Sequence, residues 1–381
     1  MSIEATVLDD DRRLLRETVR SLVSARVEPN SKAIDEDGTI PTDIYRSLTE
    51  TGLNAPTVPT AHGGGGASVV DAAILIEEMA KGSGAVATII AQNIAGVAAV
   101  VASPNVKLKA DLLPRVAKGE AILVWSADSF EDKSGILASI DDDGIVLNGK
   151  FHWVPCFDLS AKLILVAEVK VQAGTHLVAI DIANPHRGTI DVGPLESDLG
   201  LVGSALKSLT LQNVFIRTDE IIATSMGDSL AAKALRSTAQ IALAALANGI
   251  AATALRHAQV YAVERHQFGV PISDFESTRI MLGTMALNLE AARQLTFAAA
   301  AQLDSDRPGW GDKVSISANA GAKWFSSKVA VEVAIDAIQV FGGYGFVKDY
   351  PVERLMRDAK MVQLMTGSNQ ILEIANALLS S

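Results

Sequence analysis

The spacing of hydrophobic residues divides the chain into three stretches of different texture. Over residues 1–120 apolar residues recur at helical spacing, as in Val70–Met79 and Ala85–Val101, after an amphipathic segment that begins at Asp9. A loop rich in Pro and Gly interrupts this pattern. The first stretch is therefore predicted to be a helical N-terminal domain.

Short apolar and β-branched segments follow over residues 121–222. Turn signals such as Asp143-Gly144 and Asn148-Gly149 separate them at fairly regular spacing. This pattern predicts a small all-β domain, a barrel or a sandwich. The predicted strands are Ile136–Ile140, Ile145–Leu147, Leu163–Ala167, Leu177–Ile180 and Ser208–Phe215.

The chain becomes helical again over residues 223–381. Four long segments are rich in Ala and nearly free of Gly and Pro, and short connections join them, which predicts a four-helix bundle. The order of the three stretches predicts an α+β fold with segregated elements. The four segments are Ser229–Glu264, Asp274–Leu303, Asp312–Val340 and Ser368–Leu379.

Composition narrows the partners and the compartment. A formal net charge of -11, without any Lys/Arg run, argues against nucleic acid as a partner. The single Cys156 and the absence of a basic, apolar leader in Met1–Thr6 favour a cytoplasmic location. The longest apolar run, around Ile94–Ala102, is shorter than a membrane span requires, so no membrane association is expected. Six scattered His residues predict no metal site.

Several motifs occur in a fixed order toward the C-terminus. They are Leu199–Ser204, Glu264–Gly269, Gln339–Phe346, Glu353–Asp358 and Met365–Gln370. Together they resemble the acyl-CoA dehydrogenase family over most of the chain. The resemblance implies a helical domain, a β-domain and a four-helix bundle, with FAD as cofactor. It also implies a role in lipid metabolism, in the α,β-desaturation of an acyl-CoA thioester.

The resemblance raises a question about the catalytic base. In the family a buried carboxylate removes the thioester α-proton while the flavin accepts the β-hydrogen as hydride. The position usually held by this Glu is Thr366 here, and a hydroxyl does not replace a carboxylate without activation. The second base position of the family aligns with Ala239, and no Asp or Glu occurs from Ser229 through Val263. We therefore assign no catalytic residue.

Residues that would serve the chain's own flavin also depart from the family pattern. The flavin-binding Thr-Glu-Pro loop is replaced by Trp125–Gly135, which brings Asp128, Glu131 and Asp132 toward anionic phosphates. The Trp-Ile-Thr segment becomes Trp153–Pro155. The resemblance retains Trp153 as a flavin contact, but Pro155 has no N–H to donate. Two further residues match positions beside the chain's own flavin, namely Ser368 and Gln370.

Residues that reach a neighbouring subunit in the family are retained. They are Arg265, Phe268, Gln339, Gly342 and Gly343. The resemblance implies that Arg265 pairs with the neighbour's FAD pyrophosphate and that the glycines admit its adenosine end. This asymmetry predicts a base-lacking subunit that completes the flavin site of a homologous Glu-bearing partner, with a self-tetramer as the other possible assembly.

Two alternatives stay open at this stage. The chain could be an active homomeric dehydrogenase whose base has moved, for example to Glu276, which follows Phe275 where the family usually has Gln. It could also be a flavin-free assembly subunit. Thr366 suits the N-cap of the final helix, and Cys156 suits a small buried filler. An electron-transferring flavoprotein is the expected electron acceptor, and the sequence does not identify the acyl group.

Overall fold

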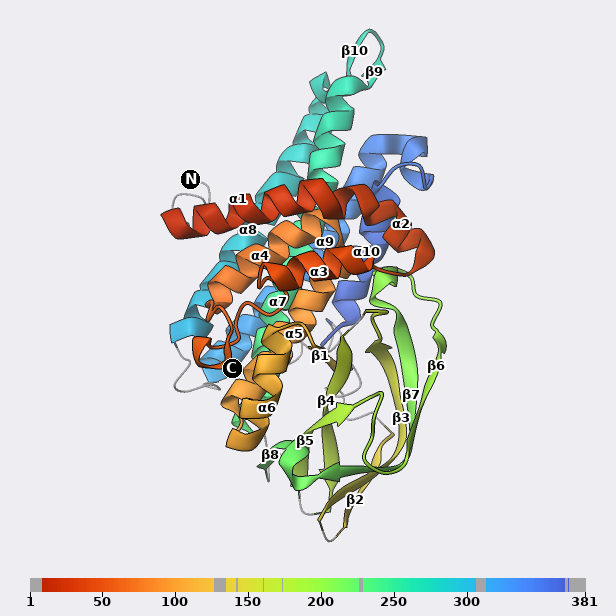
Figure 1. Ribbon diagram of the computed structural model, residues 1–381. Coiled ribbons are helices and arrows are strands. Elements are labelled where there is room, and N and C mark those ends of the chain that lie inside the picture. Colours follow the sequence, from red (N-terminus) through yellow and green to blue (C-terminus); the bar gives the residue numbers. More distant parts are fainter. Residues whose placement is uncertain are drawn as a thin grey trace.

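The computed structural model has helices at both ends of the chain and strands between them (Figure 1). Figure 1 shows the strands gathered beside the helices rather than interleaved with them, so the predicted α+β fold class is confirmed. The predicted domain boundaries stay predictions. The structure describes residues 9–126, 135–141, 143–159, 161–172, 174–225, 229–305, 313–366 and 369.

The N-terminal helices surround one helix that is buried along almost its whole length. This helix, α5, is apolar around its circumference, as a helix enclosed by other elements must be. The preceding helix begins at a capping box, in which the Ser68 hydroxyl accepts from the Asp71 N–H and the Asp71 carboxylate accepts from the Ser68 N–H. The helices are α1 (Asp10–Leu22), α2 (Ser31–Asp37), α3 (Thr42–Glu50), α4 (Val69–Gly82), α5 (Gly84–Ala102) and α6 (Val106–Ala117).

The expectation that the apolar runs are too short for a membrane span is wrong on length. By length and composition, three helical stretches of the described chain could cross a membrane: Gly84–Ala102, Leu230–Glu264 and Ala318–Phe346. The fold buries 89% of the apolar window in the first and 94% in the second, because both helices lie inside the core. Only 39% of the third window is buried.

The β-domain contains two four-stranded sheets, ordered β1-β4-β5-β8 and β2-β3-β7-β6. The five predicted strands are present. Three others were missed: β1 is a fully buried apolar run that pairs in parallel with β4, and such a run has no alternation to distinguish it from a helix. The strands are β1 (Ala121–Trp125), β2 (Leu137–Asp141), β3 (Gly144–Pro155), β4 (Lys162–Val171), β5 (Gly174–Asp181), β6 (Thr189–Leu195), β7 (Leu206–Arg217) and β8 (Ile221–Ser225).

The C-terminal helices include the three longest predicted ones and one that was not predicted. The missed helix, α10, is short and carries a charged face, so its apolar period is weak. Of the predicted final helix, Ser368–Leu379, only Asn369 lies within the described residues. The helices are α7 (Leu230–Glu264), α8 (Glu276–Ser305), α9 (Lys313–Phe341) and α10 (Val352–Leu364), with a β9 (His266–Gln267) and β10 (Val270–Pro271) hairpin between α7 and α8.

Two adjacent residues of α10 join the three parts of the molecule. The Arg357 guanidinium binds both carboxylate oxygens of Asp35 in α2, at 2.9 and 2.7 Å, and donates to the Leu199 carbonyl at 3.1 Å. The Asp358 carboxylate accepts from the Leu201 N–H at 2.6 Å. A Cβ on Gly200 would lie 2.3 Å from the Arg357 carbonyl carbon, so the β-domain loop and α10 pack backbone against backbone.

We predict that Arg357→Met lowers the free energy of unfolding by about 2–4 kcal/mol, because it leaves the carboxylates of Asp35 and Glu353 without their shared cation. Urea denaturation measures the loss. The control is Arg13→Met, which removes an exposed pair with Asp10 and is expected to cost less than about 0.5 kcal/mol. Equal losses in the two variants would contradict the role of Arg357.

We predict a pH-dependent effect of Asp358→Asn. Burial raises the pKa of Asp358 to about 6, above its ordinary value, so the folded protein holds this proton more tightly than the unfolded chain. The protonated carboxyl therefore stabilises the fold below about pH 4, and this contribution of on the order of 2 kcal/mol is lost as the pH rises through about 6.

The Asn variant should thus gain stability relative to the parent between pH 4 and pH 7, measured by urea denaturation at several pH values. Asp143→Asn, in the exposed turn between β2 and β3, is the control and should follow the parent. A difference between Asp358→Asn and the parent that is constant with pH would refute the argument.

Candidate functional site

The hairpin between α7 and α8 places two of the predicted residues at one end of the molecule. Arg265 is the C-cap of α7 and is exposed, and Phe268 lies in the β9–β10 turn with φ +53° and 95% of its surface accessible. Figure 1 shows this hairpin at the end opposite the two sheets. Its residues therefore lie far from the chain's own β-domain.

The end of α9 brings three more predicted residues to the same place. Gln339 is exposed on α9, and Gly342 and Gly343 begin the short helical turn that follows it. A Cβ built on either glycine would meet nothing within 4 Å, and Gly342 has φ +59°, so this backbone is open. The Arg265 guanidinium lies 5.9 Å from the ring centre of Tyr344, which ties the two segments together.

This edge fits the phosphate and adenosine parts of a dinucleotide. An exposed guanidinium can pair with a pyrophosphate, and open glycine backbone beside it admits a planar group closely. Tyr344 was not singled out from the sequence, although an aromatic residue within Gly-Gly-Tyr-Gly was the available signal. The five residues predicted to act across a subunit interface are thus exposed at one end, and their contact with FAD stays a prediction.

Trp153 lies on the other candidate surface, in β3. The pairing of β3 with β7 shifts register between Phe151 and Val154, and Trp153 has φ +51° with 55% of its surface accessible. Pro155, two residues on, is buried and has no N–H to offer a flavin. This part of the β-domain therefore retains an aromatic surface but lacks the hydrogen-bond donor.

Cys156 is buried beside this surface, as expected of a small filler. Burial raises the pKa of its thiol to about 11, so the unreactive thiol form predominates at neutral pH.

Thr366 lies in a buried turn directly after α10. It has φ +54°, 4% of its surface is accessible, and its hydroxyl donates to the Met365 carbonyl at 2.8 Å. Fully buried Lys323 of α9 donates to the Gln363 carbonyl at 2.9 Å and to Asn369 Oδ1 at 3.0 Å, on both sides of Thr366. Lys323 is a positioning residue that the sequence reading missed, although a lone Lys in an apolar helix was a signal.

Some predicted residues fall outside the described part of the chain. Predictions for them stay predictions, including the proposed N-cap role of Thr366 in the final helix. The residues concerned are Ser368, Gln370 and most of the Trp125–Gly135 loop, with Asp128, Glu131 and Asp132. Among the described residues, no group of three or more His, Cys, Asp or Glu could hold a metal ion.

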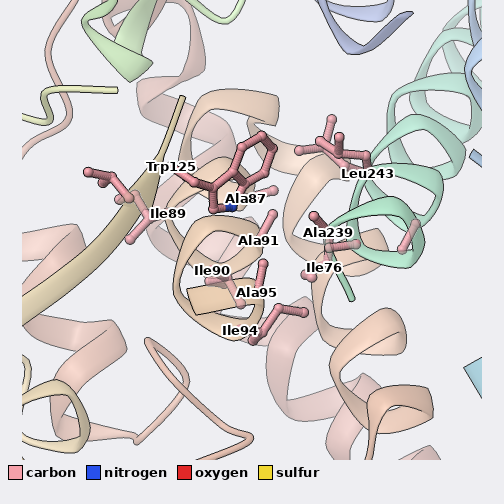
Figure 2. Packing of buried hydrophobic residues seen from close by; sticks show 14 of the residues in the cluster. Ile76, Ala87, Ile89, Ile90, Ala91, Ile94, Ala95, Trp125, Ala239 and Leu243 are labelled. Carbon is pink, nitrogen blue, oxygen red and sulfur yellow. The ribbon is translucent and has the colours of Figure 1, made fainter. Parts of the chain in front are cut away.

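A large side chain occupies the space beside Ala239. Figure 2 shows the Trp125 indole between Ala87 and Ala91 of α5 and Ala239 and Leu243 of α7. Trp125 is 1% accessible and Ala239 is 0% accessible. This second base position therefore holds no carboxylate and faces packed hydrocarbon.

Comparisons with known proteins agree with this architecture. Family models described as the N-terminal and the C-terminal domain of acyl-CoA dehydrogenase match residues 9–120 and 228–377. A probable acyl-CoA dehydrogenase of Mycobacterium leprae is 34% identical over 96% of this chain and 94% of its own length.

Solved structures show the same relationship. Butyryl-CoA dehydrogenase from Megasphaera elsdenii superposes with a TM-score of 0.87 at 26% identity, covering 98% of this chain and 99% of that one. A chain from a structure described as the electron transferring flavoprotein of Acidaminococcus fermentans gives 0.88 at 26% identity, with the same coverage. The chain belongs to the acyl-CoA dehydrogenase family of FAD-binding oxidoreductases, which confirms the resemblance.

We predict that Trp125→Ala lowers the free energy of unfolding by about 3–5 kcal/mol, because it leaves a cavity between α5 and α7. Thermal or urea denaturation measures the loss. Trp153→Ala is the matched control, and it should cost less than about 1 kcal/mol because over half of that ring is already in solvent. A small loss for Trp125→Ala would show that the site is less tightly packed than described.

Proposed function

We propose that this chain is the base-lacking subunit of a heteromeric acyl-CoA dehydrogenase in the cytoplasm. It completes the FAD site of a homologous partner that carries the catalytic Glu, and the pair desaturates an acyl-CoA thioester between the α- and β-carbons. The single buried Cys156 supports the reducing compartment.

The carrying observation is the contrast between the two ends of the molecule. Arg265, Phe268 and the Gly342-Gly343 backbone are exposed together at the hairpin end, remote from the chain's own sheets. At the other candidate site, Thr366 is buried without a carboxylate and Trp125 fills the space beside Ala239. Residues suited to serve a neighbour are open, whereas those that would serve this chain are closed or replaced.

Bound FAD supplies the hydride acceptor for the reaction. In this proposal Arg265 of the present chain neutralises the pyrophosphate, and the open glycine backbone lies against the adenosine end. The exposed Phe268 ring excludes water from the same edge. Thr366 does not act as a base, because the pKa of an alcohol is far above 7 and its hydroxyl donates to the Met365 carbonyl.

Exposed apolar side chains at the hairpin end support contact with another subunit. Phe346 is 80% accessible and Val263 is 61% accessible, and only 39% of the apolar window in the Ala318–Phe346 stretch is buried. A heteromer and a self-tetramer would both cover this surface. The missing base favours a heteromer, because self-association would place no Glu at either base position.

The position of Glu276 weighs against a relocated base. Glu276 is the exposed first residue of α8, next to the hairpin that carries Phe268. A base there would belong to the hairpin end rather than to the turn that holds Thr366. If a homomer is active, unchanged turnover of Glu276→Gln removes this residue as its base.

The other alternative is a flavin-free assembly subunit. In that case the complex with a Glu-bearing homologue shows no flavin absorbance that depends on Arg265. We propose an electron-transferring flavoprotein as the electron acceptor on the basis of family membership.

We predict that the chain purified alone holds well below one FAD per protomer, and that co-expression with a Glu-bearing homologue gives a yellow, active heteromer. Absorbance, light scattering and acyl-CoA dehydrogenase assays measure these properties. Arg265→Gln should weaken FAD binding by the heteromer about tenfold or more, since it removes a charge-assisted hydrogen bond.

The control is Arg187→Gln, an exposed residue of the β-domain that pairs with Asp141, and it should leave flavin binding unchanged. A tetramer of this chain alone, with one FAD per protomer and dehydrogenase activity, would overturn the proposal.

A further inference from the structure

A cavity of about 620 Å³ lies on the helical side of the molecule, between α1, the turn after it, α4, α7 and α8. Figure 1 shows α1 crossing over α4 and α8 in this region. Its lining is strongly cationic, and the basic side chains come from four different helices. They are Arg16, Arg20, Lys81, Arg256 and Arg293.

One buried carboxylate is shared by three of these cations. Glu78 is 3% accessible at its side chain, and its Oε1 lies 2.7 Å from Arg16 Nε and 2.7 Å from Lys81 Nζ. Its Oε2 lies 3.0 Å from Arg20 Nε. The cations hold the pKa of Glu78 below its ordinary value despite the opposing effect of burial, so it stays charged and cannot balance three positive groups.

The other two cations each have one carboxylate. Arg293 lies 2.7 Å from Glu77, and Arg256 lies 2.7 Å from Glu28. Around the cavity, five cations therefore face three carboxylates. This local excess of positive charge contrasts with the formal net charge of -11 for the whole chain.

The excess is expensive where the side chains are withdrawn from water. Lys81 and Arg293 are 22% and 21% accessible at their side chains. The pKa of Lys81 is lowered by burial first, and the nearby Arg293 lowers it further. A bound anion would compensate both groups, because attraction between charges strengthens as water is excluded.

We propose that this cavity binds a multivalent oxyanion, the phosphate portion of a small metabolite. Its volume is within the range of small-molecule sites. The guanidinium groups of Arg20 and Arg256 lie at its rim, with 48% and 52% accessible side chains, and such groups bind phosphate oxygens in a bidentate manner.

This site is separate from the proposed flavin edge. Arg256 precedes Arg265 by nine residues, which places the two about 13 Å apart along α7. The inference therefore does not depend on the proposed function, and neither a partner subunit nor turnover is needed to test it.

The test is isothermal titration calorimetry of the full chain with inorganic pyrophosphate at constant ionic strength. We expect saturable binding, weakened about tenfold by Arg20→Gln and by Arg256→Gln. Both residues are half exposed, and Glu78 keeps Arg16 and Lys81 when Arg20 is replaced, so the variants should fold. Should one fail to fold, the other decides, because it lies on a different helix.

Two controls locate the binding. Arg13→Gln changes an exposed cation on α1 that does not line the cavity, and Arg265→Gln changes the flavin edge. Both should bind pyrophosphate within twofold of the parent. The proposal is overturned by an absence of saturable binding, by equal weakening in all four variants, or by a loss confined to Arg265→Gln.

Discussion

The contact of Arg357 and Asp358 with α2 and the β-domain loop is the interaction on which the remaining structure depends. These neighbouring residues carry opposite charges, so one binds a carboxylate while the other binds a backbone N–H. Because both lie on α10, they fix this helix against two other parts of the molecule. The turn with Thr366 follows α10 directly, and its position is therefore set by the same contact.

The family's chemistry requires a carboxylate and a flavin on opposite sides of a substrate, and this chain has closed that arrangement with packing. Trp125 fills hydrocarbon space between α5 and α7, and buried Lys323 holds the turn in which a hydroxyl replaces the carboxylate. These are stable local solutions, and they leave no group to remove a proton. The hairpin end has the opposite character, with an exposed cation, open glycines and exposed aromatic rings.

Charge is distributed unevenly in this acidic protein. The carboxylates of Glu77 and Glu78 on α4 gather cations from α1 and α8, and breaking such buried pairs is costly. Specifying how α1 sits on α4 is one consequence. The surplus of positive charge beside the cavity is another, and packing alone does not require it. An anion from solution would complete this balance.

The sequence by itself determined the elements whose signals are local. Long Ala-rich periods predict α7, α8 and α9, and the spacing of Arg265, Phe268 and the paired glycines predicts an edge that serves another subunit. Only the tertiary structure decided that Ala121–Trp125 is a strand, since a short buried apolar run gains its pairing from β4. It also decided that Trp125 packs beside Ala239 and that cations from residues 16 to 293 share one cavity. Such contacts join residues distant in sequence, and no local period encodes them.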